Sequence, residues 1–340
     1  MEPTPAAAGS YRTKLWITVA VIAVLVLVNK WMAGELGQIT RPLGHPKVQL
    51  FTIMLLAILL EGFPFLLAGS FVSGALEVLV PPAFLEERVF PRQKLPAAAV
   101  GSLLGLIFPV CSCGNIPVAR RLLHKGVPVA GVVAYLLAAP IINPVTLFST
   151  AMAFPAERSV LFGRMSLAFC LAVLAGLFLG AWEVADISRE SAGEHHCHQA
   201  TVSAGTRWAH IVDHAEHDFF LTGRYLILGA SIAALFQTLL PRSAVNALAT
   251  NPLASIVLLQ FLGMAFSLCS FADAFVASTF TGLPAAAKIT FLLAGPTTSV
   301  SLIILYWGGF KKGFASRLIV LAVTGVFVLT SLAALAGRWR

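Results

Sequence analysis

Charge is the property that this sequence most lacks. Only 11% of its 340 residues are charged, whereas an ordinary soluble domain carries about 25%. Hydrophobic residues make up 58% of the chain, and its mean hydropathy is +0.87. The shortage of charge excludes a typical soluble domain and predicts an all-α polytopic membrane protein.

Signatures of several other functions are also missing. The chain has no GxxxxGK[ST] motif, so a primary ATP-driven pump within this single chain is excluded. Nothing in the sequence calls for a cofactor. The formal charge of +8 is scattered in short groups between apolar runs, which is typical of topology signals and indicates no nucleic-acid partner. Cysteine occurs five times, which is an odd number, and most of the cysteines lie inside apolar segments. Both facts exclude the disulfide framework of a small secreted domain.

Nine apolar segments are candidates for membrane-spanning helices. A bilayer core about 30 Å thick needs about 20 apolar residues in a helix. The candidates are residues 14–33, 48–80, 96–113, 128–153, 159–183, 221–241, 252–270, 284–308 and 314–336. We therefore expect about seven to nine spans, the first of which is an N-terminal anchor rather than a cleaved signal.

The sequence repeats itself in its two halves. Four pairs of segments match in the same order: 65–81 with 225–241, 111–119 with 269–277, 126–128 with 282–284, and 136–140 with 292–296. The offset between the partners stays within 156–160 residues, so we infer a duplication. Paired repeats with interrupted apolar segments are typical of secondary transporters, whose sites form where the interrupted segments meet.

The orientation of the repeats depends on whether two segments cross the membrane completely. If residues 96–125 and 252–283 are re-entrant hairpins with tips at Cys111 and Cys269, each repeat crosses three times and the halves are inverted. Of the 23 Lys and Arg residues, fourteen then lie on one side and nine on the other, which the positive-inside rule favours. Nine full crossings would divide them 11 against 12 and make the halves parallel. We expect inverted repeats, with the N-terminus and the polar loop in the cytoplasm.

These patterns divide the chain into four parts. We predict an N-terminal tail, first transmembrane helix and loop at 1–47, a first repeat at 48–183, a His-rich polar loop with an interfacial helix at 184–220, and a second repeat at 221–340.

The stretch CSCGN at 111–115 places two thiols beside helix-breaking residues. Irregular backbone at membrane depth is tolerated only where it is buried in protein or lines a wet cavity. Gly114 lacks a Cβ, Pro117 lacks an N–H, and Asn115 can satisfy freed backbone groups. The candidate solute-binding residues of this stretch and of its counterpart in the second half are Cys111, Cys113, Gly114, Asn115, Pro117 and Cys269. Alternatively, the thiols are small packing residues of a kinked helix.

A second interruption, AAPIINPVT at 138–146, lies in the middle of a predicted span. Its counterpart, AGPTTSVS at 294–301, keeps one proline and offers four hydroxyl groups. Amide and hydroxyl groups here could bind a solute, although intramembrane hydroxyls often bond back to their own helix. The candidate binding residues in the two interruptions are Pro140, Asn143, Pro144, Pro296 and Thr297.

Together these blocks resemble a known family. CSCGNIPVARRL followed by YLLAAPIINPVTL, with SFADAFVAS and FLLAGP in the second half, is similar to the predicted-permease family that includes the organoarsenical efflux permease ArsP. The resemblance covers about residues 48–336. It implies a polytopic inner-membrane permease and, for the arsenical branch, export of trivalent organoarsenicals. Many relatives carry an acidic residue soon after the second GP, where this chain has Thr297, Thr298 and Ser299, and a cation or proton role there is therefore in doubt.

Two carboxylates lie deep inside apolar runs. Such groups are costly at membrane depth and mark functional sites by default, so Glu61 and Asp273 are candidates for proton coupling. The structural alternatives are that Glu61 pairs with a buried donor, and that Asp273 caps the second arm of its hairpin.

Histidine is concentrated between residues 195 and 217. Neutral imidazole and thiolate are good ligands for zinc, copper or nickel. The alternative is that residues 207–220 form an interfacial amphipathic helix whose histidines face water. The candidate metal ligands are His195, His196, Cys197, His198, His210, His214 and His217.

These observations together predict a membrane permease rather than an enzyme. We expect it to export a small thiophilic solute across the inner membrane, with the solute and the lipid bilayer as its partners and a homo-oligomer as a further option. A soft metal ion or a sulfur-containing anion is the alternative cargo. Two functions of other classes are alternatives. One is a membrane-embedded thiol oxidoreductase, which would require a CxxC-type pair rather than CxC. The other is a non-transporting subunit or sensor that uses the histidine loop.

Overall fold

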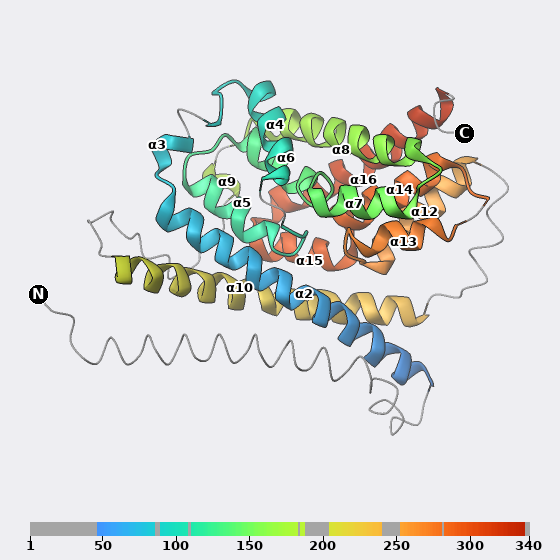
Figure 1. Cartoon of the computed structure of the whole chain (residues 1–340), viewed down its shortest axis with the longest axis horizontal. Coiled ribbons are helices and arrows are strands. Elements are labelled where there is room, and N and C mark those ends of the chain that lie inside the picture. The colour runs from blue at the N-terminus through green and yellow to red at the C-terminus, as the bar shows by residue number, and fades with distance from the viewer. Residues whose placement is uncertain are drawn as a thin grey trace, which may run out of the picture.

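Helices joined by short turns make up the described part of the chain (Figure 1). The computed structural model describes residues 46–85, 89–107, 110–182, 184–187, 204–239, 252–280 and 282–336. The predicted first span and the cluster at 195–198 lie outside these residues. In chain order the helices are α2 (Pro46–Leu79), α3 (Pro82–Phe84), α4 (Lys94–Leu103), η3 (Leu104–Leu106), α5 (Asn115–His124), α6 (Val129–Ala138), α7 (Pro144–Ala153), α8 (Arg158–Leu179), α9 (Val184–Ile187), α10 (Ala204–Leu239), α12 (Pro252–Phe266), α13 (Ala272–Ser278), α14 (Ala285–Thr298), α15 (Val300–Gly309) and α16 (Lys312–Leu335).

The outer surface of the described helices is apolar. Five stretches are long and apolar enough to cross a membrane: Lys47–Leu79, Arg158–Leu179, Trp208–Thr238, Ala285–Gly309 and Lys312–Leu335. Large apolar side chains are left open on their outer faces, among them Phe162 at 66% and Phe178 at 71% exposure. Lipid accepts such side chains, whereas water would not accept so many of them. The chain is a multi-pass α-helical membrane protein, which confirms the predicted fold class.

The two halves contain the same elements in the same order. Helices α2, α4, α5, α6, α7 and α8 correspond to α10, α12, α13, α14, α15 and α16, as the matched sequence blocks require. Their internal contacts correspond as well, because α4 and α5 pack on α6 in the first half, and α12 and α13 pack on α14 in the second. The repeats also exchange contacts, since α5 packs on α15 and α13 packs on α7.

Corresponding helices of the two halves run in opposite directions (Figure 1). Along the α2–α10 contact, Gly62 lies against Leu226 and Gly74 lies against Ile211, so the residue numbers rise on one helix as they fall on the other. Along the α8–α16 contact, Leu171 lies against Gly325, while Trp182 just beyond α8 lies against Phe314. Antiparallel partners are what inverted repeats require.

The first predicted hairpin does turn back within the protein. Helix α4 runs alongside α6 in the same direction, because Gly131 lies against Ala97 and Gly105 lies against Ala139. Helix α5 runs the opposite way, and its first residue bonds to the far end of α6 through the Asn115 amide and the Leu136 carbonyl. A ten-residue helix such as α4 is about 15 Å long, about half of a bilayer core. This arm of the hairpin is therefore too short to cross a bilayer core by itself.

Each hairpin ends in a turn that only glycine makes without strain. Gly126 has φ of 80° after α5, and Gly282 has φ of 85° after α13. Positive φ is unfavourable for residues with a Cβ, which explains why the GVP and GLP blocks match in the two halves. The proline that follows each glycine by two residues stands immediately before α6 or α14, where its fixed φ starts the next helix.

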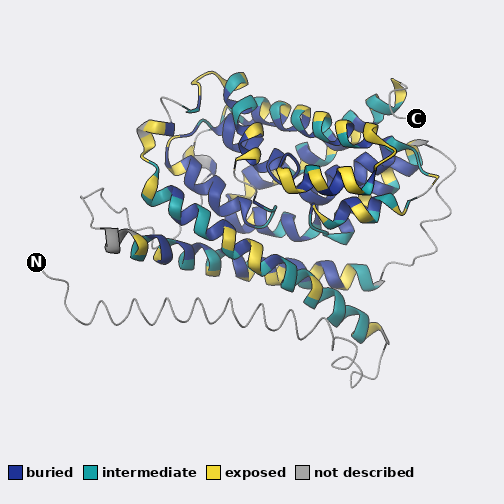
Figure 2. Ribbon diagram, in the orientation of Figure 1, coloured by how far each residue is buried: buried dark blue, intermediate teal, exposed yellow. Residues whose placement is uncertain are grey.

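The core consists of the first halves of two broken crossings. Every residue of α6 and nearly every residue of α14 is buried (Figure 2). Each is followed by a short break, and α7 or α15 then continues the crossing. Many side chains of α6 and α14 are Ala or Gly, which lets neighbouring backbones approach closely, as membrane helix packing favours. The protein therefore places irregular backbone in its interior, away from lipid.

Residues 207–220 differ from our expectation of a separate interfacial helix. They are part of α10, which continues without a break from Ala204 to Leu239, so the predicted boundary at residue 220 falls inside one helix. The physical reason is packing on α2. Ile211, Val212 and Ala215 are almost fully buried, and Asp218 accepts a hydrogen bond from Ser73 of α2 at 2.7 Å.

Membrane topology can be tested with single cysteines in a background that lacks the native ones. Gln93 and His124 flank the two ends of the first hairpin, and both are exposed. We expect Gln93→Cys and His124→Cys to react with an impermeant thiol reagent from the same face of the membrane. Ala156→Cys, beyond the broken crossing, should react from the other face. Labelling of the first two positions from opposite faces would contradict the re-entrant hairpin.

Candidate functional site

A pocket lies where the two repeats meet. Both hairpin tips, the α14–α15 break and the two long helices α2 and α10 contribute to its walls. The polar and thiol side chains in the lining are Glu61, Cys111, Ser112, Cys113, Ser267, Cys269, Ser299 and Ser301. Apolar side chains such as Phe65, Leu226 and Leu302 complete it. The three thiols that the repeat alignment predicted as ligands therefore line one space.

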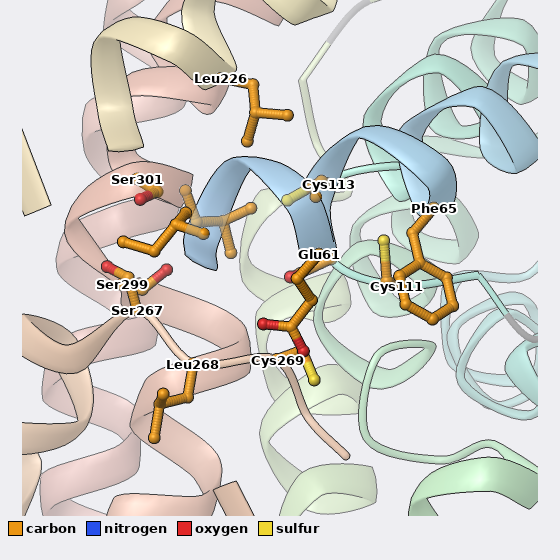
Figure 3. A pocket seen from close by; sticks show the side chains of 14 residues that line it. Glu61, Phe65, Cys111, Cys113, Leu226, Ser267, Leu268, Cys269, Ser299 and Ser301 are labelled. Carbon is orange, nitrogen blue, oxygen red and sulfur yellow. The ribbon is translucent and has the colours of Figure 1, made fainter. Parts of the chain in front are cut away.

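Glu61 lies among these side chains. Figure 3 shows its carboxylate beside Cys269, with Cys111 and Cys113 on the side of the first tip. Glu61 and the three thiols line the same pocket. A carboxylate that faces a pocket rather than lipid is the arrangement expected of a functional intramembrane acid.

The first tip is held by contacts within its own repeat. A Cβ added to Gly69 of α2 would lie only 2.5 Å from the Cα of Gly114, so the two backbones touch. The Asn115 amide donates to the Leu136 carbonyl of α6 at 2.9 Å. Pro117, in the first turn of α5, is buried. Gly114, Asn115 and Pro117 therefore shape the tip from behind and do not line the pocket.

The second tip turns tightly around Cys269. Its sulfur accepts a hydrogen bond from the Ala272 N–H at 3.4 Å, and its carbonyl accepts one from the Asp273 N–H at 3.0 Å. Two residues earlier, Ser267 has φ of 47°, the one positive value of a non-glycine residue in the described ranges. Such a backbone conformation persists only where surrounding contacts impose it.

In the second break, some hydroxyl groups bond to their own helix and others line the pocket. Thr297 and Thr298 are fully buried, and they donate to the carbonyls of Leu293 and Ala294, as the structural alternative predicted. Ser299 has extended backbone, and its side chain faces the pocket. Pro296 lies inside α14 and, like Thr297, is not part of the pocket lining.

The first break satisfies its own polar groups. Asn143 caps α7, because its side-chain oxygen accepts from the Thr146 N–H at 2.8 Å. Its amide donates to the carbonyls of Ala139 and Pro140 at 3.0 and 3.1 Å, and Pro144 begins α7. None of these residues lines the pocket. Asn143 therefore acts as the N-cap of α7 and also provides hydrogen bonds to carbonyl groups at the end of α6.

Asp273 forms an ion pair and does not reach the pocket lining. Its carboxylate accepts hydrogen bonds from Arg164 of α8 at 2.8 and 3.1 Å. Arg164 is fully buried, and Asp273 is 1% exposed. Of the two predicted acids, Glu61 is the one that faces the pocket, while Asp273 connects the two repeats.

Comparison with known proteins identifies the family. The family described as "Predicted permease" matches residues 47–335. The UPF0718 protein YcgR of Bacillus subtilis is 36% identical over 274 residues, which cover 79% of this chain and 91% of that protein. A Streptococcus mutans protein named "Putative two-component membrane permease complex subunit" is 34% identical over 261 residues, covering 76% of this chain and 86% of that protein. No solved structure matches.

The chain belongs to this predicted-permease family.

The permease shows no metal cluster among its described histidines. Within the described ranges, no group of three or more His, Cys, Asp or Glu side chains is arranged to hold a metal ion. His214 lies 3.4 Å from a guanidinium nitrogen of Arg121, which also pairs with Asp218. His210 and His217 are partly buried on the same helix. His195, His196, Cys197 and His198 lie outside the described residues, and a metal site in that loop stays a prediction.

Several residues at the permease site were absent from our predicted set. Ser299 and Ser301 were noted only as hydroxyls of an interruption, and their position directly after the break was the usable signal. Ser267 and Leu226 carry no sequence signal, because they reach the pocket only through the folding of the second repeat. Arg164 also gave a signal that could have been used, as an arginine within a predicted span.

The contact behind the first tip yields a prediction for Gly69→Ala. The new methyl group would press on the Gly114 backbone, and such overpacking costs about 1–3 kcal/mol. We expect a lower melting temperature in detergent and a changed rate of thiol labelling at Cys111 and Cys113. Gly223→Ala is the matched control, since its methyl group would meet nothing closer than 3.8 Å. Equal behaviour of the two variants would show that the contact does not position the tip.

Proposed function

We propose that the permease is a secondary transporter that exports a small thiophilic solute, such as a trivalent organoarsenical. The observation that carries the proposal is the pocket itself. Three thiols from corresponding tips of two inverted repeats line it, beside a carboxylate of the long helix α2. Duplicated tips that meet near the middle of the membrane are the arrangement in which secondary transporters bind their solutes.

The chemistry of the thiols favours a soft solute. A trivalent arsenical with one organic group carries two hydroxyls, and each can be exchanged for a sulfur. Each exchange forms one As–S bond, breaks one As–O bond and releases the thiol proton and the hydroxyl together as water. Cys111 and Cys113 are two residues apart and line the same pocket. They are therefore the pair that we assign to the arsenic, with Cys269 as a third ligand or an acceptor during transfer.

Glu61 is the group that we assign to proton coupling. It lies beside Cys269 and lines the same pocket as Cys111 and Cys113. Loading or release of a proton on this carboxylate would change the charge of the pocket as solute binds. A proton gradient could then drive export.

Two alternative cargoes share the same thiols. A soft metal ion would bind as a cation to thiolates, and a sulfur-containing anion could bind without covalent chemistry by accepting hydrogen bonds from the thiols and serines of the pocket. Uptake and efflux measured with cells that express the permease, across arsenicals, soft metals and sulfur oxyanions, would distinguish the three. Selective export of metal ions would exclude the arsenical proposal.

A thiol oxidoreductase is the alternative from another class. Membership in a permease family favours a transporter over an enzyme. The CxC spacing also differs from the CxxC pairs of thiol oxidoreductases. Formation of a stable Cys111–Cys113 disulfide during turnover, detected by mass spectrometry, would favour the enzyme.

The name of the Streptococcus mutans relative supports a proposal about assembly. That protein is named as a subunit of a two-component complex. We propose that this permease also works with a second subunit, or as a homo-oligomer in its absence. The mass of the complex extracted in detergent would test both, since a monomer of 36.1 kDa would contradict them.

Serine substitutions test the thiol site. We expect Cys111→Ser and Cys113→Ser to lose methylarsenite protection by at least about tenfold, equivalent to about 1.4 kcal/mol of binding free energy. Cys269→Ser should be intermediate. Cys170→Ser is the control, because this cysteine is exposed on α8, outside the pocket.

Membrane expression of each cysteine variant is measured beside its protection, since the near-isosteric replacement should leave folding intact. If all four variants protect cells like the parent, the pocket cysteines are packing residues and the arsenical proposal fails.

Substitution of Glu61 tests the coupling. Glu61→Gln removes the titratable proton but nearly preserves the shape, so we expect solute binding to remain and gradient-driven transport to be lost. Glu157→Gln is a control outside the pocket, and Asp273→Asn tests the second predicted acid. Full gradient-driven transport by both Glu61→Gln and Asp273→Asn would mean that these carboxylates are structural.

A further inference from the structure

Arg164 joins the first repeat to the second hairpin tip. This side chain of α8 is fully buried. One of its terminal nitrogens donates to the Thr150 hydroxyl of α7 at 2.8 Å. The other donates to both oxygens of Asp273 and, at 3.2 Å, to the Ser270 carbonyl. One guanidinium thus links two helices of the first repeat to the tip of the second.

The ion pair is difficult to explain by stability alone. Removing two charges from water is costly, and well-packed apolar residues often replace a buried pair without loss of stability. An arginine in the membrane interior marks function by default. The planar guanidinium fork of an arginine, however, holds its hydrogen-bond partners in a defined geometry. The ammonium group of a lysine does not.

The atoms that Arg164 holds lie next to Cys269 in the chain. Ser270 follows Cys269 directly, and the Asp273 N–H donates to the Cys269 carbonyl. Ser267, two residues before the cysteine, has the positive φ that needs support from its surroundings. The contacts from Arg164 to Ser270 and Asp273 thus hold the backbone that follows Cys269, while the strained residue Ser267 precedes it.

The two tips are anchored differently. At the position corresponding to Asp273, the first tip has Asn115, which bonds to Leu136 within its own repeat. The second tip is bound to the opposite repeat through Arg164. Displacement of one repeat against the other would therefore act on the second tip through this ion pair.

We propose that Arg164 is a positioning residue for Cys269, which it holds in the pocket opposite Cys111 and Cys113 by its contacts with Ser270 and Asp273. The proposal rests on the proposed function only in assigning a solute contact to Cys269. The role of the tether itself is a matter of geometry, and it can be measured without any solute.

The test uses Cys269 as the single cysteine, with Cys111, Cys113, Cys170 and Cys197 replaced by serine. The tether is removed by the double substitution Arg164→Met with Asp273→Leu, which leaves no unpaired buried charge, so the permease should fold. We expect labelling of Cys269 in membranes by a small methanethiosulfonate reagent to change by about tenfold or more, the factor that corresponds to about 1.4 kcal/mol. Arg164→Lys, which keeps the charge but loses the fork, should lie between the double variant and the parent.

Lys288→Gln is the matched control. Lys288 of α14 forms a 3.1 Å ion pair with Glu157 of the other repeat, but neither residue belongs to a tip. Its loss should leave the labelling of Cys269 unchanged. As a second control, removal of the Arg164 tether should leave the labelling of Cys111 unchanged when Cys111 is the single cysteine. Size-exclusion profiles and melting temperatures verify that each variant is folded.

Parental labelling of Cys269 in a folded tether-less variant would overturn the proposal. The double variant and Arg164→Lys give separate readings, so misfolding of one still leaves a test. In export assays, the effects of the double variant and of Cys269→Ser should be non-additive, because they act through the same thiol. Altered labelling combined with full protection by Cys269→Ser would retain the tether and reject the solute contact of Cys269.

Discussion

The structure depends on one constraint, that backbone polar groups at membrane depth must find partners inside the protein. Two hairpin tips and two broken crossings interrupt the helices, and each interruption exposes donors and acceptors. At the first break, Asn143 supplies both its oxygen and its amide to the local backbone. At the first tip, Asn115 reaches the carbonyl of Leu136. The asparagines that the sequence offers as solute ligands are needed for the fold itself.

The same constraint decides which polar groups remain for a solute. Thr297 and Thr298 bond to their own helix, and Asp273 is bound by Arg164. The polar groups left in the pocket are Glu61, the three thiols and four serines, at positions 112, 267, 299 and 301. The Cys269 sulfur also accepts a hydrogen bond from the Ala272 N–H. Under the proposed function, the thiols favour a soft solute, because thiolate is a soft ligand.

The unequal anchoring of the two tips has a mechanical consequence. Inverted repeats allow two related conformations, in which each repeat takes the arrangement that the other had. Asn115 of the first tip bonds to α6 of its own repeat, while Asp273 beside the second tip bonds to Arg164 of the other repeat. Under the proposed function, motion between the repeats would act on Cys269 through this ion pair.

The sequence by itself determined the membrane class, the duplication and the family. Apolar length, repeated GVP and GLP blocks and the CSCGN motif are local signals, and helix formation, glycine turns and proline starts follow from local physics. It also predicted that the CSCGN tip and the AAPIINP break would meet their counterparts from the second half at one site. Both tips and the second break line the pocket, whereas the AAPIINP break does not.

Only the tertiary structure decided which polar side chains face the pocket and which form hydrogen bonds or ion pairs within the protein. Glu61 and Asp273 are both acids in apolar runs, and no local feature separates them. The difference is a guanidinium of α8, more than a hundred residues before Asp273, that pairs with one acid and not with the other. The continuity of α10 through its histidines likewise depends on packing against α2, which the polar pattern of residues 207–220 does not reveal. Partners distant in sequence set these outcomes, since burial and pairing are properties of the assembled helices.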